Sequence, residues 1–277
     1  MTDRRTFLKS AGLLTAAAAL LSPSQIFARA RGGFSSKPSG KKELELEWCP
    51  FTAKMKHVFT ISNNSRSTTP IVLTRITYDG YTGYGEAAMP PYLGETTNSA
   101  IDYLKKARPV LKKFKDPFMI GAIMAEMDAI TTNNCAAKAS IDIALHDLVG
   151  QIFGQPWWKI WGFDPANCPY NSFTVGLASK EEVREKAKEA ASEGHLIKVK
   201  LGMSEEQDKM MINTIREVTD TTICIDANQG WKDKFYALDM INWLATKNVN
   251  MIEQPMPKLK LEETGWLTER SPLPIMA

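Results

Sequence analysis

Three short polar motifs, each placed where an apolar segment ends, constrain the fold of this chain more than any other feature. The motifs are Lys198-Val199-Lys200, Asp226-Ala227-Asn228 and Glu253-Gln254-Pro255. The interval from Lys200 to Asp226 is 26 residues, and that from Asp226 to Glu253 is 27. This interval fits one strand–helix–strand repeat, whose strands pair in parallel. The spacing therefore predicts that two lysines and two carboxylates converge at one end of a parallel barrel.

From Pro169 onward the sequence alternates between strand and helix patterns. Two of the helices begin with a serine followed three residues later by Glu or Gln, a pair that caps the first turn. The expected elements are a strand at 170–177, helices at 179–194, from Ser204, at 232–246 and at 259–269, and a fifth strand opening at 272. Because eight such units close a barrel, residues 166–277 are predicted to form an incomplete (β/α) barrel of the TIM type.

Residues 43–165 show a different pattern, in which strands come first and helices follow. Residues 43–85 are predicted to form antiparallel strands that turn at Asp79-Gly80. The segment 62–70 is predicted to be a polar loop, because it lacks apolar periodicity. Residues 96–150 carry apolar side chains at helical spacing. The fold class is therefore α/β, with an N-terminal α+β domain ahead of the barrel.

The first 30 residues are typical of a twin-arginine signal peptide. They contain Arg4-Arg5-Thr6-Phe7-Leu8-Lys9, an apolar run at 11–21 and the cleavage signal Ala28-Arg29-Ala30. The run is shorter than the roughly 20 apolar residues that a membrane-spanning helix needs. We expect export to the periplasm, cleavage after Ala30 and no stable membrane insertion afterwards, although a retained anchor is the alternative. Residues 31–42 have the composition of a flexible linker.

Charge and cysteine content exclude two classes of function. The whole chain has a net charge of +3, but residues 1–30 hold four Lys or Arg and one Asp, so the remainder is neutral. A nucleic-acid partner, which needs a basic face, is therefore not expected. The cysteines are Cys49, Cys135, Cys168 and Cys224. No two are closely spaced, which makes zinc improbable. Cys224 is expected in the core, and a disulfide among the other three is the less favoured alternative.

Lys198 and Lys200 lie two residues apart on one strand, so their side chains share a face while Val199 points to the other. A solvated lysine pair at a strand end is the plain alternative. Strands of a parallel barrel are covered on both sides, which favours a buried pair. Two ammonium groups in one dry site repel each other. We therefore expect a lysine pKa lowered towards neutrality, which would make that lysine a usable base.

Asp226 and Glu253 provide the hard oxygen ligands that Mg²⁺ prefers. Taken singly, each carboxylate could equally be a helix N-cap or a loop residue. Pro255 keeps the backbone before it out of helix, which fits an inward-pointing Glu253. The combination of the three motifs at repeat spacing favours a magnesium site.

Together these motifs resemble the enolase superfamily, in its muconate-lactonising subgroup and most closely the dipeptide epimerases. The likeness runs from Leu44 to Ala277. It includes a hairpin at 83–88, the helix segment 139–148 and the turn Gly154-Gln155-Pro156. The resemblance implies that the α+β domain caps a barrel whose site abstracts the proton α to a carboxylate.

The resemblance also implies a role for each motif residue. Lys200 would be the acid/base on one face of the substrate, and Lys198 would contact the substrate carboxylate or enolate. Asp226 and Glu253 would bind Mg²⁺ and stabilise the developing enediolate, with Asn228 supporting these ligands from behind.

Two further residues and a substrate class follow from the same likeness. Thr174 on the first barrel strand would contact the substrate, and Arg66 in the polar loop would recognise the side chain of the substrate. The implied substrate is a dipeptide of the L-Ala-D/L-Glu type, bound by a homo-oligomer when the protein is full length. The rivals are a cycloisomerase or o-succinylbenzoate synthase of the same subgroup, or a non-catalytic fragment of the fold.

The family places its third metal ligand at the end of the fifth strand and a second acid/base lysine on the sixth. The repeat spacing would put that carboxylate near position 278, beyond Ala277. We therefore expect the 277-residue chain to be a truncated epimerase, poorly soluble and without useful epimerase activity.

Overall fold

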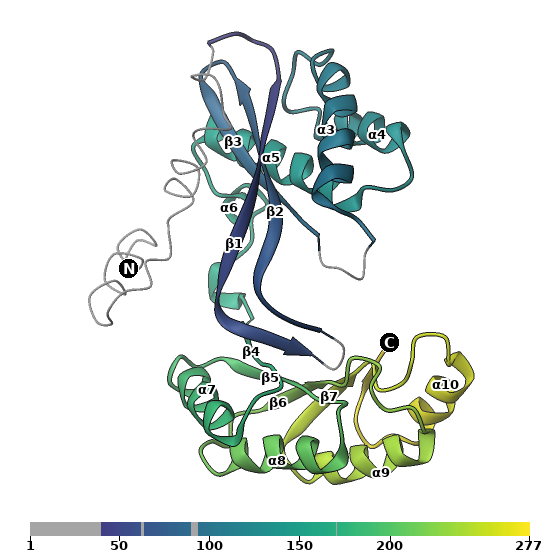
Figure 1. Ribbon diagram of the computed structural model, residues 1–277. Coiled ribbons are helices and arrows are strands. Elements are labelled where there is room, and N and C mark those ends of the chain that lie inside the picture. The colour runs from purple at the N-terminus through teal and green to yellow at the C-terminus, as the bar shows by residue number, and fades with distance from the viewer. Residues whose placement is uncertain (1–39, 62–63, 90–93, 170) are drawn as a thin grey trace. The chain divides into compact units, whose positions relative to one another are not determined.

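The computed structural model describes residues 40–277 except 62–63, 90–93 and 170 (Figure 1). The expected signal peptide and most of the linker thus lie outside the described residues. The chain divides into two compact units. Of the described residues, the first unit contains those up to Lys56 and those within Thr68–Phe163, and the second contains those within His57–Ser67 and Asp164–Ala277. Within the described residues no helix has the length and apolar character needed to cross a membrane.

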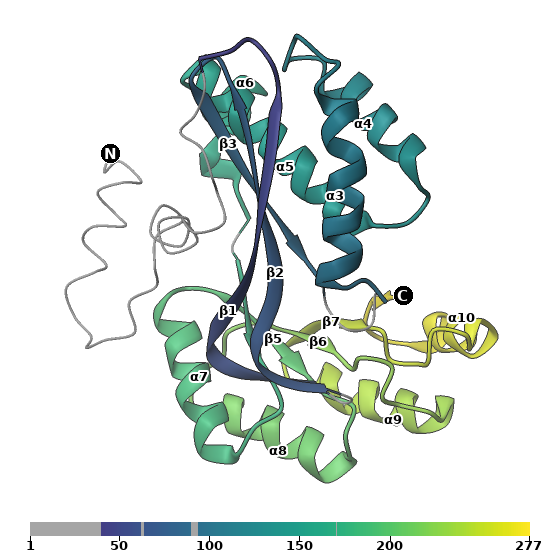
Figure 2. The same ribbon diagram turned by 45° about the horizontal axis from the view of Figure 1, so that its top comes forward.

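The first unit has the strands-then-helices order that the sequence predicts. A three-stranded sheet in the order β1-β2-β3 is followed by helices (Figures 1 and 2). The elements are β1 (Glu45–Ile61) and β2 (Asn64–Tyr78), whose ends within His57–Ser67 belong to the second unit, and then β3 (Tyr81–Ala88), α3 (Thr97–Leu111), α4 (Ile120–Ile130), α5 (Cys135–Phe153) and α6 (Trp157–Ile160). β2 and β3 are antiparallel and turn at Asp79 and Gly80, both with positive φ, as expected for a tight hairpin.

One expectation about β2 is wrong. Within the polar loop predicted at 62–70, residues 64–70 are already part of the strand, while residues 62–63 lie outside the described residues. Residues 65–70 are exposed or half-buried, so neither face of the strand needs a row of apolar side chains. Neighbouring strands supply backbone hydrogen bonds regardless of side-chain type. Apolar periodicity therefore gives no signal for this part of the strand.

Helix α5 lies directly on strand β3, and two glycines allow this close approach. A Cβ atom on Gly85 would lie 1.9 Å from the carbonyl oxygen of Ser140, and one on Gly83 would lie 2.1 Å from that of Ala144. The contact is reinforced by Thr74, whose hydroxyl donates to the Ser140 carbonyl at 2.9 Å. The Gly-Tyr-Gly spacing in β3 is thus a packing requirement of the first unit.

The second unit is a five-stranded parallel sheet in the order β4-β5-β6-β7-β8, with helices against one face (Figures 1 and 2). The partial-barrel prediction is confirmed. The elements are η3 (Pro165–Asn167), β4 (Ser172–Val175), α7 (Lys180–Ser192), β5 (Leu196–Lys200), α8 (Glu205–Arg216), β6 (Ile223–Asp226), α9 (Lys234–Ala245), β7 (Val249–Glu253), α10 (Leu261–Arg270) and β8 (Ile275–Met276). Ser179 and Glu182 form the expected reciprocal cap of α7.

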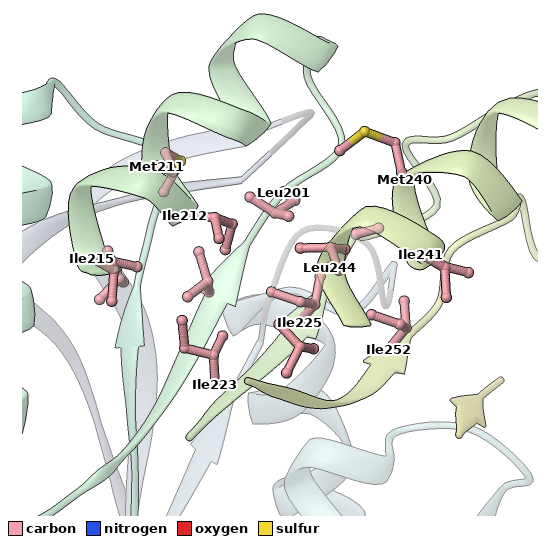
Figure 3. Close-up of a cluster of buried hydrophobic side chains, with 14 of the residues drawn as sticks. Leu201, Met211, Ile212, Ile215, Ile223, Ile225, Met240, Ile241, Leu244 and Ile252 are labelled. Atoms are coloured by element: carbon pink, nitrogen blue, oxygen red, sulfur yellow. The ribbon is translucent and has the colours of Figure 1, made fainter. Parts of the chain in front are cut away.

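The core of this unit lies between the strands and helices α7 to α10. Figure 3 shows Ile223 and Ile225 of β6 facing residues of both helices. Val199 and Ile252 are fully buried in the same layer. Because side chains alternate along a strand, burying Val199 on the helix side directs Lys198 and Lys200 to the opposite face of the sheet. The hydrophobic layer thereby orients the two lysines.

The glycine contact in the first unit leads to a stability prediction. Gly85→Ala should lower the free energy of unfolding by about 2–3 kcal/mol, because the new methyl group forces β3 and α5 apart. Urea unfolding followed by circular dichroism measures this loss.

Gly121→Ala provides the matched control, because Gly121 lies in α4 with no atom within 4 Å of an added Cβ. That substitution should be neutral or stabilise by up to about 1 kcal/mol. Equal stability of the two variants would contradict the packing explanation.

Candidate active site

Three consecutive parallel strands end side by side, and their last residues carry the charges. In the ladder Lys200 pairs with Asp226, and Asp226 pairs with Glu253. The backbone pairing continues just past the ends, where Leu201 N donates to the Asp226 carbonyl and Ala227 N to the Glu253 carbonyl, each at 3.0 Å. The register therefore fixes these side chains as neighbours.

The four charged side chains form one alternating chain of positive and negative groups. The ammonium of Lys200 donates to Asp226 Oδ2 at 2.5 Å. Lys198 Nζ lies 3.4 Å from the same oxygen and also donates to Glu253 Oε2. Asp226 is only 2% exposed and Lys200 only 8%. The structure thus brings together the two lysines and two carboxylates that the motifs singled out, and we call them the charge cluster.

The electrostatics of the charge cluster differ from the expectation. Burial alone would lower the pKa of Lys198, but the hydrogen bond with Glu253 and the charge of Asp226 outweigh burial and raise that pKa. Burial alone would raise the pKa of Asp226, yet the hydrogen bond from Lys200 brings a net lowering. The predicted lowering of a lysine pKa is therefore wrong for Lys198. Each ammonium contacts a carboxylate directly, so attraction outweighs the repulsion between the lysines.

The same carboxylates fit a shared divalent cation. Lys198 already bridges Asp226 and Glu253, which shows that one positive charge can reach both. Carboxylate oxygens are the ligands that Mg²⁺ prefers. In the described part of the chain no group of three or more His, Cys, Asp or Glu side chains is arranged to hold a metal. Asp226 and Glu253 would offer two protein ligands to such an ion.

The remaining predicted residues lie at different places in the fold. Thr174 on β4 pairs in register with Lys198 and is half-buried. The backbone N–H of Asn228 donates to Asp226 Oδ1 at 2.9 Å, so Asn228 orients that carboxylate. Arg66 is half-buried near the start of β2, in the segment that belongs to the second unit.

A cavity of about 640 Å³ opens between the loops that follow β5 and β6. Its lining includes Gly202, Trp231 and Tyr236, and the charge cluster contributes no residue to it. Of the predicted site residues, Asn228 alone lines this cavity.

One residue of interest was missed in the sequence. Asp208 in α8 is fully buried and accepts hydrogen bonds from both of these loops. A signal was present, because Asp208 lies three residues before Met211, on the apolar face of the helix. A carboxylate on a buried helix face is unusual and calls for a partner.

The buried ion pair leads to a prediction about stability and pH. Lys200→Met should lower the free energy of unfolding at pH 7 by about 2–4 kcal/mol, because Asp226 loses its nearest counter-charge. The pKa of Asp226 is lowered in the folded protein, so its stabilisation is present above the unfolded value and is lost as the pH falls. The loss in free energy of unfolding caused by Lys200→Met should therefore become smaller below about pH 3.9. Urea unfolding across this pH range measures it.

Lys180→Met is the control, since Lys180 forms an ion pair with Glu217 on the surface. That substitution should change stability little at any pH. If Lys200→Met were no more destabilising than Lys180→Met, the charge cluster would not be a buried ion pair in solution.

Both parts of the chain match known protein families. Residues 49–162 match the description "Mandelate racemase / muconate lactonizing enzyme, N-terminal domain", and residues 182–277 match "Enolase C-terminal domain-like". An L-Ala-D/L-Glu epimerase of Bacteroides thetaiotaomicron is 47% identical over the whole of this chain and 72% of its own length. A hydrophobic dipeptide epimerase of Enterococcus faecalis is 31% identical over 81% of this chain and 64% of its own.

Solved structures of related enzymes have a similar fold. The Enterococcus faecalis dipeptide epimerase, complexed with Mg and the dipeptide L-Leu-L-Tyr, has a TM-score of 0.77 and 29% identity, covering 85% of this chain and 67% of that one. The L-Ala-D/L-Glu epimerase of Bacillus subtilis, in a substrate-liganded complex, has a TM-score of 0.76 and 27% identity, with the same coverages. The present chain thus spans about two thirds of the length of these structures.

Proposed function

Because the chain belongs to the mandelate racemase and muconate lactonizing enzyme family of the enolase superfamily, whose members similar to it are epimerases and racemases, we propose that the whole protein epimerises a dipeptide of the L-Ala-D/L-Glu type with the help of Mg²⁺. The observation that carries the proposal is the charge cluster at the aligned ends of β5, β6 and β7. The 47% identity to an L-Ala-D/L-Glu epimerase supports the choice of dipeptide.

The two lysines are suited to different tasks. In its neutral amine form Lys200 would accept the proton α to the substrate carboxylate on one face, and it would thereby become the ammonium that contacts Asp226 at the buried end of the cluster. Lys198 is more exposed, at 22%. Its raised pKa keeps it protonated at neutral pH, which suits contact with an anionic carboxylate and not proton abstraction. Mg²⁺ held by Asp226 and Glu253 would supply positive charge that favours loss of the adjacent proton.

Supporting residues complete the proposed site. Asn228 fixes the Asp226 carboxylate through its backbone N–H. Thr174, beside Lys198 in the ladder, would offer a hydroxyl to the substrate. Arg66 would pair with an acidic substrate side chain, since its guanidinium matches a carboxylate in shape and charge.

Deuterium incorporation tests the proposed reaction. In D₂O with Mg²⁺, the α-carbon of the second residue of L-Ala-L-Glu should acquire deuterium, as observed by NMR of the dipeptide. Lys200→Ala should reduce this exchange by at least about 10²-fold, the usual contribution of a positioned acid/base. Chelation of Mg²⁺ should also suppress it. Exchange that persists unchanged under both treatments would refute the mechanism.

Arg66→Met tests the proposed substrate preference. The variant should raise KM for L-Ala-L-Glu by about 10- to 100-fold, the cost of losing one charge-assisted pair. The KM for L-Ala-L-Leu, which lacks the acidic side chain, should change little and serves as the control. An equal rise for both dipeptides would show that Arg66 does not read the side chain.

We also propose that the protein is exported by the twin-arginine route, on the basis of Arg4 and Arg5 ahead of an apolar run. These residues lie outside the described part of the chain. Replacing both arginines by lysine should retain the protein in the cytoplasm, as judged by cell fractionation against the unmodified protein. Equal periplasmic yield would rule out this route.

A further inference from the structure

Asp208 is a fully buried carboxylate that the proposed reaction does not use. It lies in the first turns of α8, and none of the ion pairs formed within the described residues includes it. Burial raises the pKa of Asp208, against the opposing hydrogen bonds from Trp231 and Gly202. Burying a carboxylate without a cationic partner costs free energy that an apolar side chain would avoid. The hydrogen bonds that its carboxylate oxygens accept must therefore stabilise the surrounding structure.

These atoms join two loops. Both carboxylate oxygens accept from Gly202 N, at 3.0 and 3.1 Å, and Oδ1 also accepts from Met203 N at 3.4 Å. Oδ2 accepts from the indole Nε1 of Trp231 at 3.0 Å. Gly202 follows Lys200 by two residues, and Trp231 follows Asp226 by five. One side chain thus connects the loop after β5 to the loop after β6.

The two loops also pack backbone against backbone. Gly202 has φ of +101°, and a Cβ there would lie 2.3 Å from the Ala227 carbonyl oxygen. The connection extends to a third loop, because Trp231 N donates to the carbonyl of Pro255 at 3.1 Å. Pro255 lies two residues after Glu253. All three strand ends that carry the charge cluster are therefore linked through the contacts around Asp208.

We propose that Asp208 is a positioning residue, whose carboxylate holds the β5 and β6 loops together and thereby fixes Lys200 and Asp226 relative to each other. The inference rests on the proposed function for the chemical roles of Lys200 and Asp226. The hydrogen bonds by which Asp208 connects the two loops do not depend on catalysis. Because misplacement of a reacting group by about 1 Å can cost 10²-fold in rate, such a link would influence turnover without touching the substrate.

Asp208→Asn is the test variant, because it keeps the shape of the side chain but places an amide NH₂ against N–H donors. Thr214→Val is the matched control. Thr214 is also buried in α8, and its hydroxyl donates to the Met210 carbonyl at 2.7 Å, within the same helix. The control thus loses a buried hydrogen bond of α8 without disturbing either loop. If Asp208→Asn does not fold, Trp231→Phe removes only the indole donor.

Hydrogen exchange at two backbone amides gives the decisive readout, in the absence of Mg²⁺ and substrate. Leu201 N and Ala227 N bond across the strand ends and do not contact Asp208. Asp208→Asn should accelerate their exchange by about 10- to 100-fold, the factor expected when a buried, charge-assisted hydrogen bond is lost. Thr214→Val should leave them within about twofold after correction for global stability, and Trp231→Phe should accelerate Ala227 N by a smaller factor. Acceleration confined to Gly202 and Met203 would overturn the proposal.

Kinetics supply a second readout. In Asp208→Asn, kcat for dipeptide epimerisation should fall by about 10- to 100-fold with KM within about threefold, whereas Thr214→Val should retain its kcat. A parallel loss of kcat in both variants would indicate a merely structural role and contradict the proposal. Absence of epimerase activity in the whole, unmodified protein would instead contradict the proposed function, and the exchange measurement would still decide whether Asp208 links the loops.

Discussion

The site depends on one constraint, the parallel register that aligns the last residues of β5, β6 and β7. A carboxylate as buried as Asp226 is stable only with its charge compensated, and two lysines from the neighbouring strand provide that compensation. A shift of the ladder by one residue would turn Lys198 and Lys200 towards the helices and leave Asp226 unpaired. Register and charge balance therefore stabilise each other.

The two faces of these strands have different roles, one in folding and the other in the proposed chemistry. One face carries Val199 and Ile252 into the apolar layer between the strands and the helices, and burial of this layer supplies most of the driving force for folding this unit. The other face holds the charge cluster, which lowers stability unless every charge is paired. The loops after the strands are then held together by backbone contacts and by Asp208, so that the charged face rests on a rigid support.

The sequence predicted the features that depend on local patterns. The repeat interval located the strand ends, the serine caps located the helices, and Asp79-Gly80 located the hairpin turn. It did not predict the start of β2, because the pairing of a half-exposed strand is set by its neighbour and not by its own apolar pattern. The direction of the pKa shift of Lys198 was not predicted, because it depends on which charge lies nearest to the ammonium. Asp208 looked like an ordinary acidic residue near a helix N-terminus, where negative charge is common.

The central claim is that Asp226 and Glu253 bind one divalent cation at the charge cluster. A crystal structure obtained with Mn²⁺ in place of Mg²⁺ tests this claim most directly, because Mn²⁺ gives an anomalous signal. The account predicts an anomalous peak within about 2.3 Å of an oxygen of each carboxylate, with the ammonium of Lys198 displaced from between them. A structure in which Lys198 still bridges Asp226 and Glu253 at saturating Mn²⁺, with no peak beside them, would contradict it.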